Sequence, residues 1–134
     1  PYSLGKFRIK PPPAAYTAAR KPAAVLYQRV TQEIGQLRGC LASGYPFVVG
    51  FSVYESFESD TVAATGRVPM PKKLERMVGG HAVLAVGYDH TARRFLMRNS
   101  WGTSWGDRGA FTMPYEYLLD ANLSDDFWTI KLVQ

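Results

Sequence analysis

One histidine and one asparagine carry the chemistry that this sequence predicts. His81 begins a run of small and β-branched residues that continues to Tyr88, and Asn99 ends a second apolar run that begins at Phe95. An asparagine amide can fix the rotation and tautomer of an imidazole, which leaves the other ring nitrogen available to exchange a proton with a nucleophile. Such a pair suits a thiol, because a thiolate and an imidazolium form an ion pair without a third, carboxylate charge. The structural alternative is a hydrogen-bonded histidine of the core.

The two apolar runs are predicted to form a β-hairpin, because the polar residues 89–91 between them are typical of a short turn. With a three-residue loop, Tyr88 faces Ala92 and His81 faces Asn99. Directly opposed side chains have Cβ atoms roughly 5 Å apart, which is within hydrogen-bonding reach. A slip of one residue would send one of the two side chains to the other face of the sheet, so the prediction depends on this register.

A glycine-rich loop with two tryptophans follows the asparagine. It reads NSWGTSWGDRG from Asn99 to Gly109, and GGHAVLAVGYD precedes it over residues 79–89. Together these motifs resemble the papain family of cysteine peptidases, in which the histidine lies on a strand and the asparagine opens an NSWG loop. The resemblance implies that His81 is the acid–base histidine and that Asn99 orients it. It also implies that Trp101 shields their hydrogen bond from water.

The resemblance further implies where a substrate binds. Trp105 would form the wall on the leaving-group side of the cleft, and Gly80 and Ala82 would lie along the substrate backbone and side-chain pocket. The implied activity is peptide-bond hydrolysis through a Cys-His-Asn site, with a peptide or protein as substrate. Amide hydrolysis on a non-protein substrate, or acyl transfer to an amine, uses the same groups and stays open at this point.

The nucleophilic cysteine of that family has no counterpart in its usual setting. The single cysteine, Cys40, lies near the end of a helical pattern, where the helix dipole disfavours a thiolate, and we interpret it as a small core residue. We therefore expect a cleaved or truncated enzyme, whose cysteine-bearing segment binds as a second chain. The alternative is a non-catalytic peptide-binding or regulatory protein that lacks the nucleophile.

The order of predicted elements indicates an α+β fold similar to the right-hand lobe of papain. We expect a curled antiparallel sheet or small β-barrel with one long N-terminal helix over residues 22–134, preceded by an extended inter-lobe strap over 1–21 containing a short helical turn at 14–20. The helix is predicted from apolar residues spaced by three or four positions: Leu26, Val30, Ile34, Leu37 and Leu41. Strands are predicted at 47–54, 61–65, 110–113 and 126–132, besides the hairpin, and a short helix at 114–119.

Composition bounds the remaining possibilities. The 134 residues are 46% apolar and carry a formal charge of +5, which arises from seven basic residues against one acidic residue in the first forty positions. We interpret this basic region as a solvated surface, and expect no nucleic-acid partner, no membrane partner, no metal and no cofactor. The sequence opens on Pro1-Tyr2 without a methionine, so we expect that an upstream segment has been removed or is missing from this sequence, and targeting and localisation stay unpredicted. A single cysteine suits a reducing compartment or a bacterial branch of the family.

Overall fold

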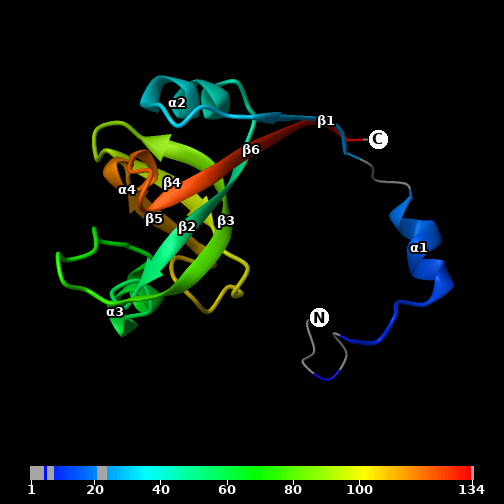
Figure 1. The fold of residues 1–134 in the computed structure, drawn as a ribbon, viewed down its shortest axis with the longest axis horizontal. Coiled ribbons are helices and arrows are strands. Elements are labelled where there is room, and N and C mark those ends of the chain that lie inside the picture. The colour runs from blue at the N-terminus through cyan, green and yellow to red at the C-terminus, as the bar shows by residue number, and fades with distance from the viewer. Residues whose placement is uncertain (1–4, 6–7, 21–23, 134) are drawn as a thin grey trace.

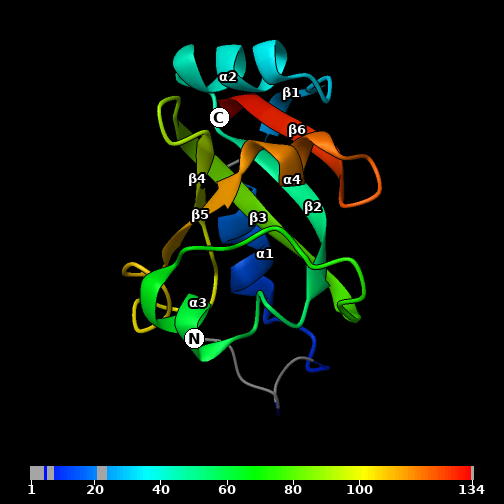
Figure 2. The ribbon, with the colours of Figure 1, turned by 90° about the vertical axis from the view of Figure 1, so that its left-hand side faces the viewer.

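The chain folds around one antiparallel sheet of six strands in the order β1-β6-β2-β3-β4-β5. The computed structural model describes residues 5, 8–20 and 24–133. The strands are β1 (Ala24–Arg29), β2 (Phe47–Tyr54), β3 (Met77–Asp89), β4 (Arg94–Arg98), β5 (Ala110–Pro114) and β6 (Ser124–Val133). The sheet twists strongly, and β1 and β5 are its two edges among the described strands (Figures 1 and 2). The α+β fold with a curled antiparallel sheet is therefore confirmed, as an open sheet.

The core lies on one face of this sheet. Burial alternates along β2, where Phe47, Val49, Phe51 and Val53 are buried and the residues between them are not. This period of two is what a strand with one covered face requires. The short helix α4 (Tyr115–Leu119), which was predicted, covers part of that face with three buried side chains.

The long N-terminal helix is confirmed only in its second half. The helix α2 spans Ile34–Ala42 and ends before Gly44, whose φ of +81° suits a glycine at a helix C-terminus. Residues 24–29 instead form strand β1, paired with β6, and position 22 lies outside the described residues. Leu26 is half exposed and contributes nothing to an apolar helix face, whereas Leu37 is completely buried. The pairing of β1 with β6 overrides the helical spacing of the apolar residues in this segment, and Leu26 fitted that spacing by coincidence.

The predicted strand at 61–65 is wrong, because these residues form helix α3 (Asp60–Thr65). The hydroxyl of Ser59 accepts a hydrogen bond from the backbone N–H of Val62, which caps the start of the helix. Gly66 follows the helix with a φ of +65°. The serine cap and the trailing glycine were the sequence signals of a helix here, and they outweigh the β-branched composition.

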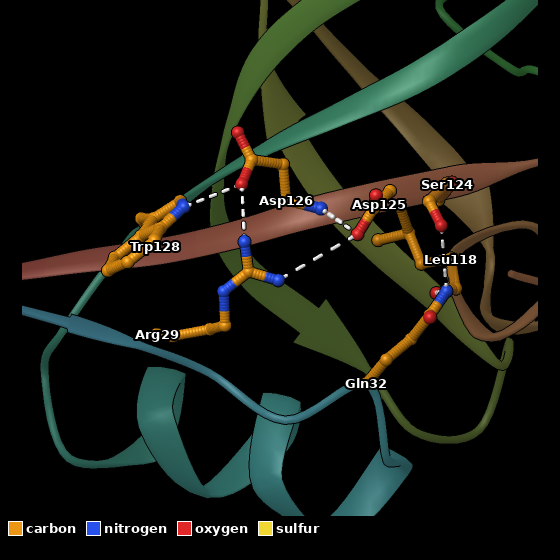
Figure 3. A network of polar contacts seen from close by, with 7 residues as sticks. All are labelled: Arg29, Gln32, Leu118, Ser124, Asp125, Asp126 and Trp128. Carbon is orange, nitrogen blue, oxygen red and sulfur yellow. Dashed lines mark hydrogen bonds and ion pairs between the residues drawn. The ribbon is translucent and has the colours of Figure 1, made fainter.

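Polar contacts fasten the edge strand β1 to β6 (Figure 3). The Arg29 guanidinium bonds Asp126 Oδ1 at 2.9 Å, and the same carboxylate oxygen accepts from Trp128 Nε1 at 2.7 Å. Beyond the strand, the Gln32 amide donates to the backbone oxygens of Leu118 and Ser124, both at 3.0 Å. These bonds fix the chain as it turns from β1 into α2.

The helix α1 (Pro13–Ala19) stands apart from the sheet in Figure 1. It agrees with the short helical turn predicted within the strap, of which residues 1–4, 6, 7 and 21 lie outside the described part of the chain. The inter-lobe position of the strap stays a prediction. None of the described helices has the length and apolar character needed to cross a membrane.

Candidate active site

The structure brings the predicted histidine and asparagine into contact. His81 Nε2 lies 2.9 Å from Asn99 Oδ1. His81 extends from β3, where it pairs with Phe51 of β2, and Asn99 lies directly after β4. The asparagine is 8% exposed, so the hydrogen bond is largely protected from water. The predicted contact is therefore observed, and the catalytic roles of the two residues stay predictions.

The register that led to this prediction is wrong. The turn holds four residues, 90–93, so that Tyr88 pairs with Phe95 instead of Ala92. A bulge between Ala85 and Gly87 then shifts the pairing back by one position. The net displacement along the two strands is two residues.

A displacement of two preserves the face on which each side chain lies. Leu84 pairs with Arg98, so the direct partner position of Asn99 is that of Val83. His81 lies two residues from Val83 and projects from the same face of β3. The His81–Asn99 bond is therefore a diagonal contact between neighbouring strands, which long side chains can span.

The hydrogen bonds of Asn99 define the tautomer of the histidine. Asn99 Oδ1 also accepts the backbone N–H of Ser100 at 2.8 Å. Because a backbone N–H only donates, this atom must be the amide oxygen, and His81 Nε2 must donate to it. The neutral ring then carries its lone pair on Nδ1, which makes no hydrogen bond to any described residue. Nδ1 is thus the ring nitrogen available for proton exchange.

Two aromatic side chains cover the imidazole. The Trp101 ring stacks on it at 5.0 Å between centroids and 25° between planes. Phe57 lies beneath, 1% exposed, and touches five rings. Those rings belong to Phe51, His81, Trp101, Trp105 and Phe111. Shielding of the hydrogen bond by Trp101 stays a prediction, and Phe57 is a supporting residue for which the motifs held no signal.

The glycines of the tryptophan loop permit its close turns. Asn99 N–H donates to Gly109 O at 2.9 Å, and Gly109 N–H donates to Trp105 O at 2.8 Å. A Cβ on Gly106, whose φ is +62°, would lie 2.5 Å from the backbone oxygen of Ala110. Only glycine fits there, so the loop is held in the shape that places Trp101 over the histidine.

A tyrosine supports the strand beneath the site. Tyr117 of α4 donates its hydroxyl to the backbone oxygen of Ser52 at 2.7 Å, and its ring packs 6.0 Å from that of Phe51. Burial raises the pKa of Tyr117 above its ordinary value, so the hydroxyl stays a donor. Through Ser52 and Phe51 it steadies the part of β2 that pairs with His81.

A hollow of about 160 Å³ opens beside the imidazole. Its walls come from β2, β3, the segment before α3 and the tryptophan loop: Val53, Glu58, Val78, Gly79, Gly80, His81 and Trp101. Of the predicted substrate-binding residues, Gly80 lines this hollow. Trp105 lies in the aromatic cluster next to Trp101, and Ala82 pairs with Gly50 on the face of the sheet away from the core. Substrate binding by Gly80, Ala82 and Trp105 stays a prediction.

The single cysteine lies elsewhere. Cys40 belongs to α2, which packs at the end of the sheet opposite to α3 (Figures 1 and 2). Its thiol donates to the backbone oxygen of Tyr45 at 3.3 Å and lines a separate hollow of about 270 Å³. That hollow shares no lining residue with the one beside His81, so the thiol and the imidazole lie in separate places on the fold.

Comparison with known proteins identifies one family. A family model described as papain family cysteine protease matches residues 13–124. An uncharacterized peptidase C1-like protein of Acanthamoeba polyphaga mimivirus is 46% identical over 140 residues, which cover 98% of this chain and 45% of the viral protein. Pro-cathepsin H of Medicago truncatula is 35% identical over 85 residues, or 58% of this chain and 22% of the plant protein.

A solved structure gives the same result for the fold. Xylellain, a cysteine protease from Xylella fastidiosa, superposes with a TM-score of 0.86 at 48% identity. The superposition covers 93% of this chain and 46% of xylellain. The chain therefore spans less than half the length of these relatives.

Proposed function

Because this chain belongs to the papain family of cysteine proteases, we propose that it is the His- and Asn-bearing part of a cysteine peptidase completed by a cysteine-bearing segment. That segment would be a second chain held to this one by contacts across the lobes. The observation that carries the proposal is the hydrogen bond of 2.9 Å between His81 and Asn99, with Nδ1 of the imidazole left available.

In the proposed reaction, His81 Nδ1 faces the thiol and takes its proton, which yields a thiolate and an imidazolium. The thiolate attacks the carbonyl carbon of the peptide bond, the C–N bond breaks, and the imidazolium gives its proton to the departing amine. Water then attacks the thioester while Nδ1 accepts one of its protons. The C–S bond breaks, and the thiolate–imidazolium pair is restored. Asn99 and Trp101 hold the ring in one orientation throughout.

The outer face of the sheet supports the presence of a completing segment. On this face, the apolar side chains of Val48, Val86 and Leu96 are each about two-fifths exposed. Apolar surfaces of this kind mark interaction sites when they are contiguous.

The test is the composition and reactivity of the protein as cells produce it. We expect intact-mass measurement under denaturing conditions to give a second polypeptide beside the 15.0 kDa chain, and a thiol-directed peptidase inhibitor to label that second polypeptide. His81→Ala should abolish labelling, whereas His90→Ala, at the exposed turn, should leave it unchanged. A single species of 15.0 kDa that takes no label would reject the peptidase and favour a non-catalytic binding protein.

A further inference from the structure

The hollow beside His81 contains one carboxylate. Glu58 is the only acidic residue among its seven lining residues, and apart from His81 it is the only titratable one. The remaining walls are the side chains of Val53, Val78 and Trp101 and the backbone of two glycines. A negative charge thus lines a hollow that also holds the imidazole and three apolar or aromatic side chains.

No described residue neutralises this charge. The structure gives the Glu58 carboxylate neither a hydrogen bond nor an ion pair within the described chain. Its neighbours differ: Glu55 pairs with Arg76 at 2.7 Å, and Glu75 accepts the backbone N–H groups of Ser56 and Lys72. Of the three glutamates around this loop, Glu58 alone keeps its carboxylate available to a ligand.

The residues on either side hold Glu58 in place. Phe57 precedes it and is fixed by the aromatic cluster under His81. Ser59 follows it and caps α3 through its bond from Val62 N–H. The backbone N–H of Glu58 donates to Glu55 O at 3.2 Å. The carboxylate therefore extends from a backbone position that is defined on both sides.

The reaction determines which part of a substrate meets the hollow. His81 gives its proton to the departing amine, so the residue that carries this amine must lie against the imidazole. The hollow includes His81, and its apolar walls suit the alkyl stem of a long side chain, while Glu58 suits a cationic group at the end of that stem. Lysine and arginine combine both features.

We propose that Glu58 gives the enzyme a preference for Lys or Arg as the first residue on the leaving-group side of the cleaved bond. This proposal rests on the proposed peptidase function. Glu58 determines specificity here and takes no part in the chemical steps. The pair that it forms with the substrate is partly exposed to solvent, which bounds its contribution to about three- to fivefold in kcat/KM.

The experiment measures the complete enzyme on three peptides that differ only at that residue, which is Lys, Gln or Glu. We expect kcat/KM to follow the order Lys, Gln, Glu, and Glu58→Gln to reduce the Lys-to-Gln ratio about three- to fivefold, to near one. The Asp60→Asn enzyme should cleave all three peptides as fast as the parent enzyme. Asp60→Asn is the matched control, because it removes the same charge two residues away, outside the hollow.

Charge reversal provides the second variant. Glu58→Lys should invert the order so that the Glu peptide becomes the best of the three. An unchanged Lys-to-Gln ratio in Glu58→Gln, or an equal loss in Asp60→Asn, would overturn the proposal. Failure of the peptidase assignment itself has a different signature, because the parent enzyme would then cleave none of the three peptides.

Discussion

Removing the Asn99 amide is the most direct test of how this site works. In Asn99→Ala, His81 Nε2 loses the acceptor that lies 2.9 Å away, while Trp101 still stacks on the ring. A hydrogen bond to a charged group contributes about 1.5–3 kcal/mol. If this amount is lost when the imidazolium forms and reacts, kcat should fall about 10- to 150-fold. KM should change much less, because the amide is buried behind the ring and is not among the residues of the hollow.

The assay is the steady-state cleavage of one fluorogenic peptide by the complete enzyme, with kcat and KM measured separately. Asn122→Ala is the control, because the Asn122 amide is exposed and donates to Asp120 on the surface. Asn99 also accepts the Ser100 N–H, so a thermal melt must show that the variant is folded at the assay temperature. Unchanged kcat in a folded Asn99→Ala enzyme, or a loss confined to KM, would refute the orienting role.

Three further predictions concern the framework of the site. Phe57→Ala should lower the free energy of unfolding by about 3–5 kcal/mol in chemical denaturation, because it removes the ring at the centre of the aromatic cluster. A smaller loss of stability would mean that the cluster collapses around the gap. Arg94 donates to two backbone oxygens and a hydroxyl between β4, β5 and the segment after α3, and burial lowers its pKa. Arg94→Met should cost about 2–4 kcal/mol in the same assay. Arg98 lies on the same face of β4, but its side chain is exposed and makes one long bond of 3.5 Å, so Arg98→Met should cost less than about 0.5 kcal/mol. The hydrogen bond from Arg93 lowers the pKa of Glu116 below its ordinary value. The stabilisation that this bond gives is therefore complete above the ordinary pKa of a glutamate and is lost as the pH falls through the lowered pKa. Glu116→Gln should flatten the acid limb of a plot of stability against pH, and an unaltered limb would contradict this.

Local sequence patterns predicted an element correctly where interactions within that segment determine its structure. The alternation of Phe47, Val49, Phe51 and Val53 predicted strand β2 and its buried face, because a period of two leaves no other way to cover four apolar side chains. Pro114 followed by apolar residues predicted α4 for a similar local reason. The errors at 24–29 and 61–65 arose where partners distant in sequence, or a cap at Ser59, outweighed composition.

For the active site, the sequence by itself determined which groups are present. His81, Asn99, Trp101 and the glycines of the loop recur in an order that identifies the family, and an imidazole beside a neutral amide has a limited range of chemistry. The contact between His81 and Asn99 was predicted through an incorrect register. It exists because two irregularities of the hairpin sum to an even displacement and so preserve the face.

Only the tertiary structure decided what surrounds the imidazole. Phe57 and Glu58 lie more than twenty positions before His81 and belong to no motif shared with it. They meet it because β2 pairs with β3, which sets Phe51 opposite His81 and returns the chain beneath the tryptophan loop. Pairing of strands is a property of the whole sheet, and no spacing within one segment encodes it. The identity of the reacting groups is thus local information, whereas the ring that supports them and the charge that faces the hollow are consequences of the assembled fold.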